Sequence, residues 1–108
     1  MDLRRYQRFP VKLQSVLSGS SRNEWTGTIV DLSKGGCRIE TNAQVYAGMQ
    51  VSLRLEIAGE ASPIFIAMAG VRWNRPILVG VGFISVESPH RERLDHILEQ
   101  LKQGSKSS

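Results

Sequence analysis

Val51-Ser52-Leu53-Arg54-Leu55-Glu56-Ile57 alternates apolar and polar side chains at every position, and this stretch decides the fold class. An alternation with a period of two predicts a strand that buries one face and exposes the other. Similar short runs fill the chain between Pro10 and Val86, and polar or glycine-containing turns separate them. We expect six strands, over residues 11–17, 25–30, 37–41, 51–57, 64–73 and 78–84. Short strands at regular spacing, with no helix between them, predict an antiparallel barrel or sandwich.

One helix is predicted, at the end of the chain, over residues 88–103. Ser88 can cap its first turn, and Pro89 suits the first helical position. Four apolar residues then recur at the spacing i, i+3, i+4 and i+7, which places them on one face: Leu94, Ile97, Leu98 and Leu101. We expect this face to pack on the barrel and close one end of it. The alternative is a helix that binds a partner.

The chain is expected to form a single domain over residues 1–103. Its 108 residues suffice for one ordinary domain and are too few for two. Residues 1–9 are interpreted as a flexible arm and residues 10–86 as the barrel. Gly104 is a stop signal for the helix, and residues 104–108 are predicted to be a disordered tail. The content of 41% hydrophobic and 22% charged residues is typical of a soluble globular protein and excludes a compositionally disordered chain.

No segment predicts export or insertion into a membrane. Residues 1–5 carry charge directly before polar sequence, so they do not resemble a signal peptide. The longest mostly apolar stretch, Pro63–Val71, is too short to cross a bilayer as a helix. Cys37 is the single cysteine, which excludes an intramolecular disulfide and a zinc site built from several cysteines. We therefore expect a cytoplasmic protein.

Basic residues outnumber acidic ones and gather near the N-terminus. Fourteen Lys and Arg against ten Asp and Glu give a formal net charge of +4. Most of the basic residues are arginine, whose planar guanidinium suits phosphate and guanine edges better than the point charge of lysine. Arg4, Arg5, Arg8 and Lys12 lie within the first twelve residues, where only Asp2 opposes them. This cluster predicts an anionic partner near the N-terminus.

Two short motifs carry the most specific signal. Arg4 and Arg8 form an RxxxR pair, and Asp31-Leu32-Ser33-Lys34-Gly35-Gly36 reads DxSxxG directly after a predicted strand. Each motif alone is weak, since DxSxxG is also compatible with a tight turn in which side-chain oxygens bond nearby amides. Together, in this order and in an all-β chain of this length, they are far more specific.

With these motifs the sequence resembles a PilZ domain, the bacterial receptor module for the second messenger cyclic di-GMP. The resemblance extends to Gly70-Val71-Arg72-Trp73 and Val79-Gly80-Val81-Gly82-Phe83, a pair of runs typical of the last strands of the family. It implies a six-stranded antiparallel split barrel with a C-terminal helix. It also implies a cytoplasmic receptor without a cofactor. Such a receptor would relay its signal to an effector protein in motility, chemotaxis, polysaccharide synthesis or biofilm formation.

The resemblance also assigns ligand contacts. Arg4 and Arg8 match the paired arginines that bind phosphate and the O6/N7 edge of guanine, and Arg5 would add a phosphate or stacking contact. Asp31 matches the acidic position that accepts hydrogens from guanine N1 and N2. The arginine-bearing arm is expected to be mobile without ligand and to fold over it when it binds.

The turn would contribute further contacts. Ser33 would bond the same base or the turn itself. Gly36 would leave space for the purine, and Gly35 would do the same or serve only the turn. Arg38 is expected to face either the ligand or solvent, and Trp73 either to stack on a guanine or to pack in the core.

Rival functions have less support. The two histidines, His90 and His96, lie about 240° apart around the helix axis, so they do not share a face as metal ligands. No set of catalytic residues is evident, and we expect no enzyme activity and no metal. A small basic barrel that binds RNA or DNA is the stronger alternative, although only 6% of the residues are aromatic and no stacking platform is evident. A family member that binds only protein is a third possibility. A monomer or weak dimer is expected.

Overall fold

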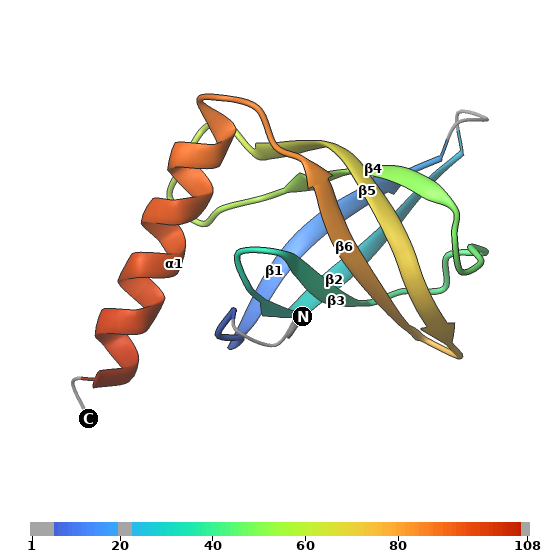
Figure 1. The fold of residues 1–108 in the computed structure, drawn as a ribbon, viewed down its shortest axis with the longest axis horizontal. Helices are drawn as coiled ribbons and strands as arrows, with labels where there is room; N and C mark the ends of the chain where they lie inside the picture. Colours follow the sequence, from blue (N-terminus) through green and yellow to red (C-terminus); the bar gives the residue numbers. More distant parts are fainter. Residues whose placement is uncertain (1–5, 20–22, 107–108) are drawn as a thin grey trace.

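Six antiparallel strands form a closed barrel, and one helix follows them (Figure 1). The structure is a computed structural model that describes residues 6–19 and 23–106. The elements are β1 (Phe9–Ser18), β2 (Glu24–Leu32), β3 (Gly36–Glu40), β4 (Gln50–Leu55), β5 (Ile64–Arg75), β6 (Leu78–Ser85) and α1 (His90–Lys106). Their order around the barrel is β1-β2-β3-β6-β5-β4, and β1 closes it by pairing with β4. The predicted fold class is confirmed.

Alternate side chains of the strands fill the interior. In β4, Val51, Leu53 and Leu55 are buried, whereas Arg54 is exposed, as the alternation predicts. The strand ends at Leu55 rather than at Ile57, which is only partly buried and packs against the edge of the core. Burying aliphatic side chains of this size contributes about 1.5–3 kcal/mol each to stability.

A β-bulge in β2 changes the direction of its last residues. Ile29 pairs with Ile39 on β3, but Asp31 pairs with Arg38, so Val30 is an extra residue on β2. Without this bulge Asp31 would share the inward direction of Ile29. With it, Asp31 lies beside Arg38 on the outer surface. The predicted strand over residues 25–30 was therefore too short, because Asp31 belongs to β2 and not to the turn.

A second bulge, in β5, places two consecutive residues on the same face. Val71 pairs with Val81 and Trp73 pairs with Gly80, which leaves Arg72 as the extra residue. Val71 is buried in the barrel, and the side chains of Arg72 and Trp73 both lie against the outer surface of β6. Trp73 is therefore not a core residue, and β5 continues beyond it to Arg75.

The predicted ends of the arm and of the helix need correction. Phe9 is 7% exposed and begins β1, so the arm cannot extend to residue 9. The helix spans His90–Lys106 instead of residues 88–103, and Ser88 and Pro89 precede it. Gly104 lies inside the last turn without the positive φ of a helix-ending glycine, so the helix continues through it, and the predicted tail is helical as far as residue 106.

The apolar face of α1 packs on one end of the barrel (Figure 1). Leu94 and Leu98 are buried, and Ile97 and Leu101 pack against the same core. Arg93 fastens the helix to the β4–β5 connection by donating to the carbonyls of Pro63 (2.9 Å) and Ser62 (2.6 Å). The apolar face is thus part of the domain's own core. Within the described residues, no helix has the length and apolar character that crossing a membrane requires.

Candidate functional site

A cleft of about 440 Å³ opens on the outer surface, where the N-terminal segment passes the β2–β3 turn and strands β5 and β6. It brings together residues that are far apart in sequence, namely Tyr6, Gln7, Arg8, Ser33, Gly35, Gly36, Cys37, Arg38, Arg72, Trp73, Gly80, Val81 and Gly82. Three of these side chains are arginines and none is a carboxylate. The cleft is therefore suited to an anion.

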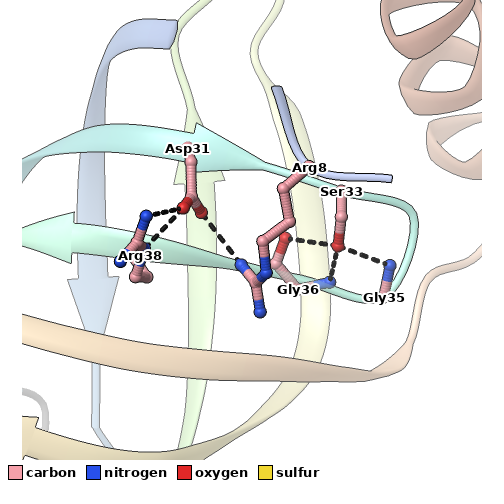
Figure 2. Close-up of polar contacts among 6 residues, drawn as sticks. All are labelled: Arg8, Asp31, Ser33, Gly35, Gly36 and Arg38. Atoms are coloured by element: carbon pink, nitrogen blue, oxygen red, sulfur yellow. Dashed lines mark hydrogen bonds and ion pairs between the residues drawn. The ribbon is translucent and has the colours of Figure 1, made fainter. Parts of the chain in front are cut away.

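Asp31 lies at the edge of this cleft between two arginines (Figure 2). Arg8 Nη1 donates to Asp31 Oδ1 at 3.0 Å, and Arg38 Nε donates to Oδ2 at 2.5 Å, with Arg38 Nη2 on the same oxygen. The Asp31 side chain is only 6% exposed, whereas those of Arg8 and Arg38 are 55% and 45% exposed. A buried carboxylate needs such partners to remain charged. The two predicted motifs thus meet through Arg8 and Asp31, which are 23 positions apart.

Ser33 builds the turn that follows Asp31 (Figure 2). Its hydroxyl donates to the Gly36 carbonyl (3.2 Å) and accepts from the amides of Gly35 (3.2 Å) and Gly36 (3.1 Å). A hydroxyl has one hydrogen and two lone pairs, so these three bonds use its full capacity. In this structure Ser33 serves the turn, which was one of its two predicted roles.

Both glycines of the turn are in close contact with neighbouring groups. A Cβ on Gly36 would lie 2.3 Å from the Val81 carbonyl oxygen of β6, which leaves no space for any side chain. A Cβ on Gly35 would meet the Tyr6 ring at 2.9 Å, because that ring lies on the turn. These contacts hold the turn against β6 and under the N-terminal segment, and they place both glycines in the wall of the cleft.

Trp73 and Arg72 form the opposite wall. The indole ring lies on Gly80, where a Cβ would be 2.3 Å from the ring, and the Arg75 guanidinium lies 5.2 Å from the ring centroid. Arg72 lies in the same way on Gly82. Arg72 was not among the site residues predicted from the sequence. Glycines at alternate positions of a strand signal a close approach by another group, and this signal was present in residues 79–83.

Cys37 lines the cleft with a buried thiol. It is 1% exposed, and its burial, together with the charge of Asp31, raises the pKa of the thiol far above its ordinary value despite the opposing effect of Arg8. The thiol therefore stays protonated at neutral pH. Among the described residues, no group of three or more His, Cys, Asp or Glu side chains could hold a metal ion.

Six of the nine predicted site residues thus lie together in the structure: Arg8, Asp31, Ser33, Gly35, Gly36 and Arg38. Trp73 lies across the cleft from them. The other two, Arg4 and Arg5, lie outside the described residues. Tyr6 and Gln7 were not predicted and line the cleft through their place in the N-terminal segment.

Comparison with known proteins identifies the family. The model of the PilZ domain family matches residues 2–100, and the chain therefore belongs to this family. A comparison with curated protein sequences yields no match.

Several solved structures, one of them a PilZ domain, have the same fold. The PilZ domain of YcgR from Escherichia coli, solved with c-di-GMP, has a TM-score of 0.75 at 16% identity, with 97% of this chain and 95% of that one covered. The c-di-GMP complex of MrkH from K. pneumonia has a TM-score of 0.71 at 18% identity, over 98% of this chain and 55% of that one. The inhibitor of motility MotI (DgrA) from Bacillus subtilis has a TM-score of 0.74 at 17% identity, over 100% of this chain and 55% of that one. This chain thus spans about half the length of the last two proteins.

Proposed function

We propose that this PilZ domain is a receptor for cyclic di-GMP. The observation that carries the proposal is the contact of Arg8 with Asp31 beside a cleft lined by three arginines. The c-di-GMP complexes of YcgR and MrkH, which share the fold, support the choice of ligand.

The chemistry of the cleft suits this ligand. Cyclic di-GMP carries a charge of about −2 on its two phosphates, and guanidinium groups bind phosphate oxygens through charge-assisted, often bidentate hydrogen bonds. Guanine presents N–H donors at N1 and N2, and a carboxylate can accept both of them, whereas adenine lacks this pair of donors. Asp31 is the carboxylate at the cleft edge, so it would select guanine over adenine.

Binding requires an exchange of partners at Asp31. In the structure, Arg8 Nη1 donates to Oδ1 of Asp31 and Arg38 donates to Oδ2. We infer that Arg8 leaves Asp31 for a phosphate or for the O6/N7 edge of a guanine, and that the guanine N–H groups replace it. Arg38 then keeps Asp31 in position through Oδ2. Each buried polar group exchanges one partner for another, so none is left unsatisfied.

The remaining predicted residues take supporting roles in this proposal. Arg4 and Arg5 add contacts from the N-terminal segment. Ser33, Gly35 and Gly36 hold the turn, and Trp73 offers its indole to a guanine ring. Ordering the segment costs about 1–2 kcal/mol per residue in backbone entropy, and the charged contacts must exceed this cost.

The proposed receptor acts in the cytoplasm and is not an enzyme. Its signal passes to an effector protein through a surface that changes when the N-terminal segment closes on the ligand. The processes we propose are motility, chemotaxis, polysaccharide synthesis or biofilm formation. A protein with this fold, MotI (DgrA), is an inhibitor of motility.

Calorimetric titration tests the proposal with three ligands: cyclic di-GMP, cyclic di-AMP and a single-stranded oligonucleotide. We expect cyclic di-GMP to bind at micromolar concentration or below, cyclic di-AMP to bind much more weakly, and Arg8→Ala and Asp31→Ala to abolish binding. Arg54→Ala is the matched control, since Arg54 lies on β4 outside the cleft and pairs with the exposed Glu56 that follows the strand. Steeply salt-dependent binding of the oligonucleotide, without a response to cyclic di-GMP, would instead favour a nucleic-acid-binding barrel.

A further inference from the structure

Arg72 differs from every other arginine in the described part of the chain. Six arginines there have a carboxylate, a carbonyl or an aromatic ring as a partner: Arg8, Arg38, Arg54, Arg75, Arg91 and Arg93. Within residues 6–19 and 23–104, Arg72 has no such partner, although its side chain lines the cleft. Its five N–H donors are therefore available to a ligand.

The fold places this guanidinium against the outer surface of β6. Arg72 follows the buried Val71 and therefore faces the outer surface, and the bulge in β5 brings Trp73 to the same face. A Cβ on Gly82 would lie 2.5 Å from Arg72 Nε and 2.7 Å from Nη2, so the guanidinium lies directly on the bare backbone of β6. Arginine at a bulge and glycine on the neighbouring strand together hold one cation at the wall of the cleft opposite the N-terminal segment.

We propose that Arg72 binds a phosphate of the ligand and is its first charged contact. This inference rests on the proposed function, cyclic di-GMP binding. Arg8 must give up its bond to Asp31 before it can bind a phosphate fully, and Arg38 has two donors on the same carboxylate. Arg72 has no ion pair to break, so it can take a phosphate while Asp31 still holds the other two arginines. The ligand phosphate nearest to β5 and β6 binds Arg72, and Arg8 then binds the ligand from the opposite side of the cleft.

If Arg72 binds a phosphate first, replacing it should lower both the affinity for cyclic di-GMP and the rate of association. We expect Arg72→Ala to weaken cyclic di-GMP binding about ten- to hundredfold, the range for losing hydrogen bonds to a charged group. We also expect slower association, because the charge that attracts the ligand into the cleft is lost. Arg72→Lys keeps the positive charge but loses the planar guanidinium that can bind a phosphate with two donors. Compared with Arg72→Ala, it should therefore restore the association rate more fully than the affinity.

Calorimetry and stopped-flow tryptophan fluorescence measure these effects on the full chain, and thermal unfolding confirms that each variant is folded. Arg54→Ala removes the same charge on β4, away from the cleft, and this variant should bind cyclic di-GMP within about twofold of the unmodified protein.

Three outcomes would contradict the proposal. If Arg72→Ala binds normally while Arg8→Ala does not, the role of Arg72 is wrong and the receptor function stands. If Arg54→Ala weakens binding as much as Arg72→Ala, the loss of one positive charge anywhere on the protein explains the effect, and the proposed contact of Arg72 with a phosphate is wrong. If the unmodified protein does not bind cyclic di-GMP, the proposed function fails and the role of Arg72 fails with it.

Discussion

Asp31 and Arg38 are paired across the β2–β3 ladder because Val30 is an extra residue on β2. This one residue decides whether the carboxylate faces the aliphatic core or the cleft, since side chains alternate between the two faces of a strand. The guanidinium of Arg38 then meets the carboxylate with Nε and Nη2. The bulge thus creates the acidic edge of the site, and the paired arginine fixes its orientation.

Removal of Arg38 should destabilise the fold, and the effect should depend on Asp31. We expect Arg38→Ala to lower the free energy of unfolding by about 1–3 kcal/mol, because the buried carboxylate loses its partner at Oδ2 and keeps only Arg8. In the double variant Asp31→Asn with Arg38→Ala no buried charge remains, so it should lose less stability than the sum of the two single variants. Urea unfolding of all four proteins measures this coupling. If the losses in the free energy of unfolding of the two single variants simply add in the double variant, the ion pair does not stabilise the fold.

Gly36 at the turn and Gly70 in β5 offer a second test, since both pair with Gly82 of β6 from opposite sides. Gly36→Ala should lower the free energy of unfolding by about 1–3 kcal/mol, because the new Cβ would meet the Val81 carbonyl, which is held in the sheet. Gly70→Ala places its Cβ 3.5 Å from Ile84 Cδ1, an ordinary contact, and should be neutral or stabilise by up to about 1 kcal/mol. Equal effects of the two substitutions in thermal or urea unfolding would contradict the steric explanation.

The parts of the fold and site that depend on local sequence patterns could be predicted, and those that depend on the register between strands could not. The alternation at Val51–Leu55 and the turn at residues 33–36 depend on local patterns, and both were predicted. The two bulges depend on the register between strands, which alternation within one strand does not encode. For this reason Asp31 was placed after its strand, and the outward position of Trp73 was left open. The end of the helix was also missed, because glycine near a C-terminus signals a stop only if it adopts a positive φ.

Replacing Ile77, which lies in the β5–β6 hairpin, should stabilise the folded protein. Its φ is +64°, a conformation that costs a β-branched residue about 1–3 kcal/mol, and its side chain is 66% exposed. Ile77→Gly should therefore raise the free energy of unfolding by about 1 kcal/mol, since the relief of strain exceeds the added entropy of the unfolded chain. Ile84→Gly is the control, because Ile84 is 59% exposed within β6 and is not in a positive-φ conformation. Glycine at position 84 should lower the melting temperature, and a similar loss at position 77 would contradict the strain argument.

The buried thiol of Cys37 makes stability depend on pH in the alkaline range. Burial raises the pKa of the thiol in the folded protein above its ordinary value of 9.0, so the unfolded chain loses this proton first as the pH rises. The contribution of Cys37 is therefore constant below about pH 8 and decreases above pH 9, by up to about 1.4 kcal/mol per pH unit. Urea unfolding between pH 7 and pH 10 measures the slope for the unmodified protein and for Cys37→Ala.

The alanine variant has a cavity that lowers its stability by a similar amount at every pH, so only the slopes are compared. The two proteins differ only at position 37, so the effects of all other groups cancel in the difference. We expect the stability of the unmodified protein to fall more steeply above pH 9, and a thiol reagent at pH 8 to label Cys37 only after urea unfolds the chain. Parallel slopes, or rapid labelling of the folded protein, would show that water reaches the thiol through the cleft and that the wall formed by β3 and β6 opens in solution.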